Sequence, residues 1–123
     1  MQTEQLIAIV REALDDVKAR DVDVIDVRGK SSITDYMMIA SGTSKRHVVS
    51  LAQAVSDKVK QADIEPLGTE GQSDGDWVLV DLGELVVHIM MPDARSYYDL
   101  ERLWRFDSLE DETVEANASV LKG

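Results

Sequence analysis

The chain of 123 residues contains no cysteine, two prolines and one phenylalanine. Without cysteine it can form neither a disulfide framework nor a Cys-ligated metal site. Its apolar runs are only a few residues long, and the N-terminal sequence MQTEQLIAIV has no basic leader ahead of an apolar segment. We therefore expect no signal peptide, no membrane-spanning helix and a cytoplasmic location.

Positive charge is also scarce. The chain has 13 Lys and Arg against 24 Asp and Glu, a formal net charge of −11, and its pI is near 4.4. Because nucleic-acid binding depends on clustered cations, we expect little direct binding to nucleic acid. A basic protein is the better expectation for a partner.

The segment from Trp77 to Met91 predicts a β-hairpin about the turn Gly83-Glu84, since Gly in the first turn position accepts the positive φ that tight hairpins need. Pairing outward from the turn places an apolar set on one face: Val78, Val80, Leu82, Leu85, Val87, Ile89 and Met91. The opposite face carries Trp77, Leu79, Asp81, Val86, His88 and Met90. This mixed face is too apolar for an idle solvent face and too polar for a deep core, so we interpret it as a half-covered binding surface.

Before the hairpin, the sequence predicts an amphipathic helix capped by Thr3 and two strands, Val22 to Val27 and Tyr36 to Ala40. A second amphipathic helix should end near Ala62, and Pro66 to Glu70 reads as a weak strand. After the hairpin, a short helix capped by Asp93 is expected over residues 94–104, with Tyr97, Leu100 and Trp104 on one side.

This order predicts an α/β fold, a two-layer mixed five-stranded sheet with helices mainly on one face. Too little chain remains to cover the other face, which should hold the mixed side of the hairpin. We expect one domain over residues 1–104. Five carboxylates and no strong periodicity follow Phe106, so residues 105–123 are predicted to be a flexible acidic tail.

Most of the six aromatic residues gather at the hairpin and the helix after it: Trp77, Tyr97, Tyr98 and Trp104. They could simply fill a core, as aromatic residues usually do. Trp77, however, falls on the mixed face, and Asp81, Glu101 and Arg102 lie nearby in sequence. We favour a partner-binding patch with a polar rim.

The junction SGTSKRH, Ser41 to His47, is a second candidate site. Amide groups at a helix N-terminus together with Lys45 and Arg46 could hold an anion. The alternative is an ordinary cap, formed by Thr43 or Ser44, whose cations are neutralised by Asp35 or Glu70. The glycine spacing of a Walker loop is missing.

Catalytic signals are weak. Asp21/Asp23 and Asp74/Asp76 have an Asp-x-Asp spacing that can bind magnesium, but such pairs arise by chance in so acidic a chain. His47 and His88 are the only histidines, and no Ser-His-Asp signature accompanies them. We expect no catalytic residue, no metal ligand and no cofactor.

Four segments occur in order: GKSSITDYMMIASGTSKRHV, EG, WVLVDLGELVVHIM and RSYYDLERLW. Together they resemble the ribosomal silencing factor family, also called Iojap-related or YbeB-like, over about Leu6 to Trp104. The resemblance implies a nucleotidyltransferase-like α/β fold that lacks the catalytic metal-binding carboxylates of that fold. It also implies binding to large-subunit ribosomal protein fourteen, a block on joining of the small subunit when nutrients are scarce, and frequent homodimers.

Residues carried over from the family are Trp77, Asp81, Val87-His88 and the run Tyr98 to Trp104, whereas Met90 stands at a position that is often aromatic in relatives. Two other functions remain open: assembly of the large subunit, and a nucleotide-binding or nucleotidyltransferase-like enzyme using Ser41 to Arg46. The possible anion-binding residues are Ser44, Lys45 and Arg46. The predicted partner-binding residues are Trp77, Leu79, Asp81, His88, Met90, Tyr98, Leu100, Glu101 and Trp104.

Overall fold

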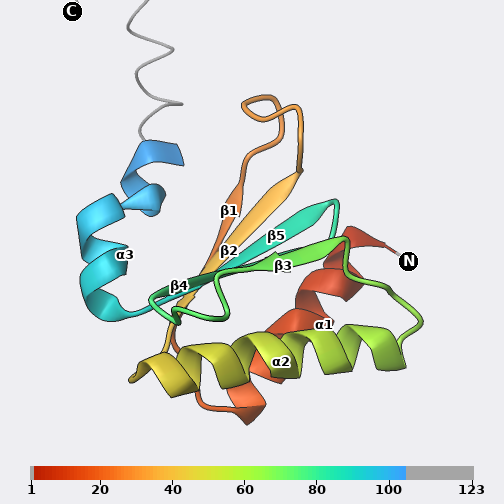
Figure 1. Ribbon diagram of the computed structural model, residues 1–123. Coiled ribbons are helices and arrows are strands. Elements are labelled where there is room, and N and C mark those ends of the chain that lie inside the picture. The colour runs from red at the N-terminus through yellow and green to blue at the C-terminus, as the bar shows by residue number, and fades with distance from the viewer. Residues whose placement is uncertain (1, 105–123) are drawn as a thin grey trace, which may run out of the picture.

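The structure is a computed structural model that describes residues 2–104 (Figure 1). The tail predicted for residues 105–123 lies outside the described residues. Each predicted helix and strand is found, although the last helix is shorter than expected. The elements in chain order are α1 (Thr3–Asp16), β1 (Arg20–Asp26), β2 (Tyr36–Ser41), α2 (Lys45–Gln61), β3 (Gly68–Glu70), β4 (Trp77–Asp81), β5 (Leu85–Met90) and α3 (Pro92–Tyr98).

The strands form one mixed five-stranded sheet in the order β1-β2-β5-β4-β3. The central strands β2 and β5 are parallel, and the other neighbouring pairs are antiparallel. Parallel pairing requires a long crossover, which α2, β3 and β4 provide. The helices α1 and α2 lie against one face, while α3 lies at the other side of the sheet (Figure 1). The predicted α/β class and sheet are confirmed.

The hairpin has the predicted register. Val78 pairs with Ile89, Val80 with Val87, and Trp77 with Met90. Gly83 has a φ of 88°, a left-handed conformation that glycine adopts without a steric penalty. The predicted separation of the two hairpin faces is therefore correct.

Two hydrophobic cores result from this separation. The main core lies between the sheet and the helices α1 and α2, and includes Leu14, Leu51, Val80 and Ile89. The second core lies on the opposite face, and its buried residues are Ile25, Val27, Met37, Ile39 and Met90.

The sequence predicts an open second face, but in the structure part of this face is covered. Ala94 of α3, together with Leu100 and Trp104, packs against the second core, so that these residues cover part of it. Met90 is fully buried, and His88 is only 6% exposed. The segment formed by α3 and residues 100–104 is short, so the sequence did not predict that it covers the sheet. It nevertheless buries this part of the second face.

Two predicted helix caps are wrong. Thr3 is the first residue of α1, and Gln2 is its N-cap; the backbone N–H of Gln2 donates to Gln5 Oε1 at 2.9 Å. Met91 is the N-cap of α3. Pro92 takes the first helical position, which suits its fixed φ and missing N–H, and moves Asp93 into the first turn.

The helix predicted over residues 94–104 is interrupted at Asp99, which has φ 50° and ψ 53°. Helical conformation resumes over residues 100–104. The interruption rotates the two halves relative to one another. Tyr97 is therefore 81% exposed, whereas Leu100 and Trp104 pack against the second core, and the expected common side is wrong.

Candidate partner-binding site

Three aromatic side chains form a continuous patch where α3 crosses the start of β4. The ring centroids of Trp77 and Tyr98 lie 4.7 Å apart, and those of Tyr97 and Tyr98 lie 5.0 Å apart in an edge-to-face arrangement. Tyr98 is 52% exposed and Tyr97 is 81% exposed. We call Trp77, Tyr97 and Tyr98 the aromatic patch; it presents large apolar surface with polar tips, a composition typical of binding sites.

Trp77 is fixed in place by the hairpin beneath it. Its indole Nε1–H donates to His88 Nδ1 at 2.9 Å. Burial lowers the pKa of His88 from 6.5 to about 4, which keeps the imidazole neutral near pH 7 so that Nδ1 can accept this bond. The direction agrees with the 6% exposure of this residue. His88 thus orients the tryptophan ring.

The predicted site residues fall into different environments. Met90 and His88 are buried and support the patch without offering surface of their own. Leu79 and Asp81 follow Trp77 along the outer side of β4 and are half-buried. Asp81 Oδ1 accepts from the backbone N–H of Gly83 at 2.9 Å, so this carboxylate stabilises the hairpin turn.

Glu101 is engaged by Arg95 within the chain. Arg95 Nε and Nη2 donate to the two carboxylate oxygens of Glu101 at 3.0 and 2.7 Å, a bidentate arrangement. Arg95 Nη1 also donates to Ser41 Oγ at 2.8 Å. The bond to Glu101 raises the pKa of Arg95. No sequence pattern indicates this pair, because a separation of six residues does not bring two side chains together on a continuous helix.

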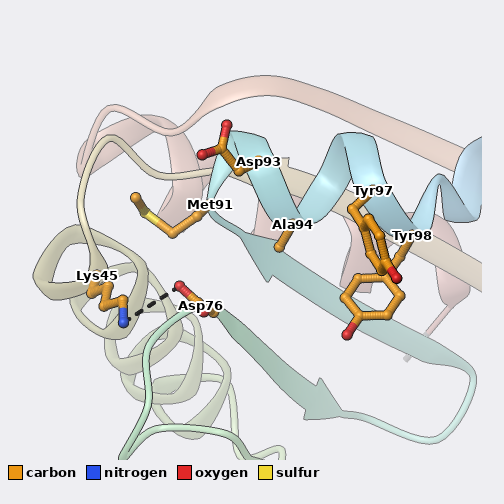
Figure 2. Close-up of a pocket in the computed structure, with 7 residues that line it drawn as sticks. All are labelled: Lys45, Asp76, Met91, Asp93, Ala94, Tyr97 and Tyr98. Atoms are coloured by element: carbon orange, nitrogen blue, oxygen red, sulfur yellow. Dashed lines mark ion pairs between the residues drawn. The ribbon is translucent and has the colours of Figure 1, made fainter.

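A pocket of about 560 Å³ lies beside the aromatic patch. Figure 2 shows its residues coming from the start of α2, the residue before β4, the N-cap of α3 and α3 itself. Two carboxylates, Asp76 and Asp93, and the rings of Tyr97 and Tyr98 line it. The sequence analysis placed Tyr97 in the aromatic cluster but assigned Asp76 to a chance Asp-x-Asp pair and Asp93 to a helix cap. The signal that could have found these two carboxylates is their position at the two ends of the hairpin.

The pocket and the SGTSKRH junction share Lys45. Its Nζ lies 3.7 Å from Asp76 Oδ1, as the dashed line in Figure 2 marks. The expected neutralising residues, Asp35 and Glu70, are therefore the wrong ones for Lys45. A Cβ added at Gly75 would lie 2.9 Å from Lys45 Cβ, so glycine permits this close approach of the loop to α2.

Ser44 is the N-cap of α2, as one of the two predicted candidates. Its Oγ accepts from the backbone N–H of His47 at 3.0 Å. His47 Nδ1 accepts from the backbone N–H of Thr43 at 2.8 Å, and its Nε2 lies 2.6 Å from the carbonyl oxygen of Val17. Two amides of the junction are thus already bonded within the chain, while Arg46 is exposed.

Neither a metal centre nor a membrane span is found within residues 2–104. No three or more His, Asp or Glu side chains in this range are placed to hold one metal ion. No helix in the same range combines the length and apolarity needed to cross a bilayer.

Fold and site together define a small acidic α/β protein with an exposed aromatic patch. Residues 1–122 match the profile of a family described as "Ribosomal silencing factor during starvation". The chain is 48% identical over 99 residues to a ribosomal silencing factor of Haemophilus influenzae, covering 80% of this chain and 97% of the relative. The chain belongs to the ribosomal silencing factor family.

Two further similarities extend this result. A crystal structure of a Chromobacterium violaceum protein superimposes with a TM-score of 0.83 at 41% identity, covering 85% of this chain and 87% of the other. A mouse protein named "Mitochondrial assembly of ribosomal large subunit protein 1" is 33% identical over 121 residues, which cover 96% of this chain and 51% of the relative. These relatives are named for silencing and for assembly, and none of the three names describes an enzyme.

Proposed function

We propose that this protein represses translation by binding large-subunit ribosomal protein fourteen on the large ribosomal subunit, in the cytoplasm, where it sterically blocks joining of the small subunit. Nutrient limitation is the condition in which this repression operates. Membership in the silencing factor family supports the ribosome as the target. The observation that carries the proposal on this chain is the exposed aromatic patch on a protein with a net charge of −11.

Charge and shape have separate roles in this interaction. The patch supplies apolar area that is desolvated on binding, and rigid aromatic rings give such area at a low entropic cost. The acidic surface, including Asp76 and Asp93 beside the patch, attracts a basic partner and speeds the encounter. Leu79 and Asp81 extend the docking surface along β4, while His88 and Met90 hold it from below.

The direct test measures binding to purified large subunits and, by light scattering, their association with small subunits. Tyr98→Ala should weaken large-subunit binding by about 2 kcal/mol, as truncation of a central aromatic residue does. Trp77→Ala should weaken it at least as much. Ile33→Ala is the matched control, because Ile33 is 81% exposed but is not part of the patch. Equal losses in the control and the patch variants would contradict the assigned surface.

A second candidate, assembly of the large subunit, is favoured by the name of the mouse relative. The two functions differ when binding is saturated. Repression by steric block requires that wild-type protein bound to mature large subunits keeps small subunits apart. If bound protein leaves subunit association unchanged, the steric block is wrong and the assembly role replaces it.

The family resemblance also supports a homodimer of the free protein, and we propose that it uses the same aromatic patch. Sedimentation of wild type and Tyr98→Ala over a range of concentrations tests this. A shared patch predicts that Tyr98→Ala is monomeric and that rising concentration of wild-type protein lowers its apparent affinity for the large subunit. A variant that remains dimeric would place the dimer interface elsewhere.

A further inference from the structure

The interruption at Asp99 determines how α3 is oriented relative to residues 100–104. On the α3 side, little burial holds this orientation. Asp99 adopts the left-handed conformation, which costs a residue with a side chain more than it costs glycine. No residue of α3 itself is buried. Residues 100–104 are held by the packing of Leu100 and Trp104 on the second core, so contacts across the interruption are needed to fix α3 relative to them.

Arg95 makes those contacts. It bridges the interruption from α3 to Glu101 through two hydrogen bonds, and it reaches the end of β2 through Ser41. The side chains of Arg95 and Glu101 are only 13% and 26% exposed, so water screens this ion pair less than it screens a surface pair. Ser41 is 4% exposed, which makes it a rigid anchor in the sheet. At the far end, Lys30 Nζ donates to the carbonyl oxygen of Trp104 at 3.2 Å.

We propose that Arg95 is a positioning residue: by holding Glu101 and Ser41 together it fixes the Asp99 interruption and thereby seats Tyr98 on Trp77. Glu101 then acts inside the chain and does not need to contact the partner. This inference rests on the proposed function only for its effect on ribosome binding. Its structural consequence, an ordered aromatic patch, exists in the free protein.

The ribosome-binding test is a double-mutant cycle of Arg95→Met, Glu101→Gln and the double variant on purified large subunits. Each single change should weaken binding by about tenfold, which is near the lower end of what a hydrogen bond to a charged group contributes. The affinity of the double variant for the large subunit should be no lower than that of the single variant with the lower affinity, because both changes remove the same interaction. The contrary outcome is that Glu101→Gln still weakens binding in the Arg95→Met background, so that the fold-losses of the two single variants multiply. This would show that Glu101 contacts the partner directly and would overturn the inference.

The salt dependence of association adds a second criterion. A carboxylate that faces a basic partner contributes to steering, so its removal flattens the dependence of the association rate on ionic strength. Glu101→Gln should instead leave that slope unchanged and raise the dissociation rate. Arg28→Met is the matched control, because Arg28 makes a similar bidentate contact to Asp26 but is 61% exposed; it should change neither rate.

A ribosome-independent test uses the free protein. In wild type, nuclear Overhauser contacts should connect the rings of Trp77 and Tyr98, and amides of residues 100–104 should be protected from hydrogen exchange. Arg95→Met should lose both, Arg95→Lys should retain part of each, and the milder Ser41→Ala should weaken them without loss of the fold. Unchanged ring contacts in a folded Arg95→Met protein would refute the positioning role. If wild type fails to bind the large subunit, the proposed function fails while this test still decides the role of Arg95.

Discussion

The two faces of the hairpin are built from alternate residues of the same strands, yet they differ in what they bury. On the α1 and α2 side, β4 and β5 contribute Val78, Val80, Val87 and Ile89, all fully buried. On the other side the same strands contribute Trp77 and the buried imidazole of His88. The first face contributes stability alone, whereas the second combines burial with specific hydrogen bonds.

The difference follows from the cost of burying polar groups. A buried imidazole or guanidinium is tolerated only where hydrogen-bond partners are supplied. His88 accepts from Trp77, and Arg95 is paired with Glu101 and Ser41. These bonds orient particular side chains, so the second face has the fixed geometry that the proposed docking surface requires.

The largest expected effect distinguishes the two faces directly. Val80→Asp would place an unpaired carboxylate in the main core, where an uncompensated charge costs about 3–5 kcal/mol, enough to unfold a marginally stable domain. Leu79→Asp, one residue along β4, should cost about 1 kcal/mol because its side chain faces the half-covered side. Urea unfolding followed by circular dichroism measures both. Similar losses in the two variants would mean that the faces are equally deep.

The next effect concerns acid. The pKa of His88 is lowered from 6.5 to about 4, so the neutral form stabilises the fold in full above pH 6.5, and this contribution is lost as pH falls toward 4. Linkage gives a loss of about 3 kcal/mol between pH 7 and pH 4 from this one group. His88→Gln keeps a hydrogen-bond acceptor without titrating in this range.

The measurement is the free energy of unfolding at pH 7 and pH 4 for wild type and His88→Gln. Carboxylates titrate in both proteins, so the difference between them isolates the imidazole. Wild type should lose more stability than the variant over this interval. Parallel pH profiles would indicate that His88 is exposed to solvent in the folded protein.

Sequence reasoning was accurate for the hairpin because strand periodicity and the turn at Gly83 determine register with local information only. It failed at Asp99, where a single left-handed residue interrupts an otherwise helical pattern. A non-glycine residue in this conformation leaves no periodic signature. The burial of His88 and Met90 depends on α3 folding back over the sheet, which is a tertiary contact.

The candidate site was therefore only partly predictable. Trp77 and Tyr98 could be named because aromatic residues clustered in the sequence near a mixed strand face. The pairing of Arg95 with Glu101 could not, since it exists only after the Asp99 interruption forms. Asp76 pairs with Lys45 although 30 residues, 46 to 75, lie between them in the chain, and neither residue type indicates its partner.

A smaller effect tests the support beneath the aromatic patch. Trp77→Phe keeps a ring but removes the N–H that His88 Nδ1 accepts at 2.9 Å, which should cost about 1 kcal/mol of stability. Because a proton on Nδ1 would no longer displace a donor, the pKa of His88 should rise from its wild-type value. An NMR titration of the imidazole measures this. An unchanged pKa would mean that burial alone, without the tryptophan bond, determines the titration.

The smallest effect is expected at the rim of the pocket. Lys45 and Asp76 are 58% and 51% exposed and lie 3.7 Å apart, so Lys45→Met should change the free energy of unfolding by less than about 0.5 kcal/mol. Lys58→Met is the comparison in the last turn of the same helix, α2. Lys58 Nζ lies 3.6 Å from both Glu12 and Asp16, and its side chain is 30% exposed. Because Lys58 joins α1 to α2 and is less exposed, its replacement should cost more than that of Lys45. Thermal unfolding with and without sodium pyrophosphate completes the test. The pairing of Lys45 with Asp76 indicates a rim contact, so pyrophosphate should not raise the unfolding temperature. If pyrophosphate stabilises wild type and Lys45→Met abolishes this stabilisation, Lys45 binds an anion instead.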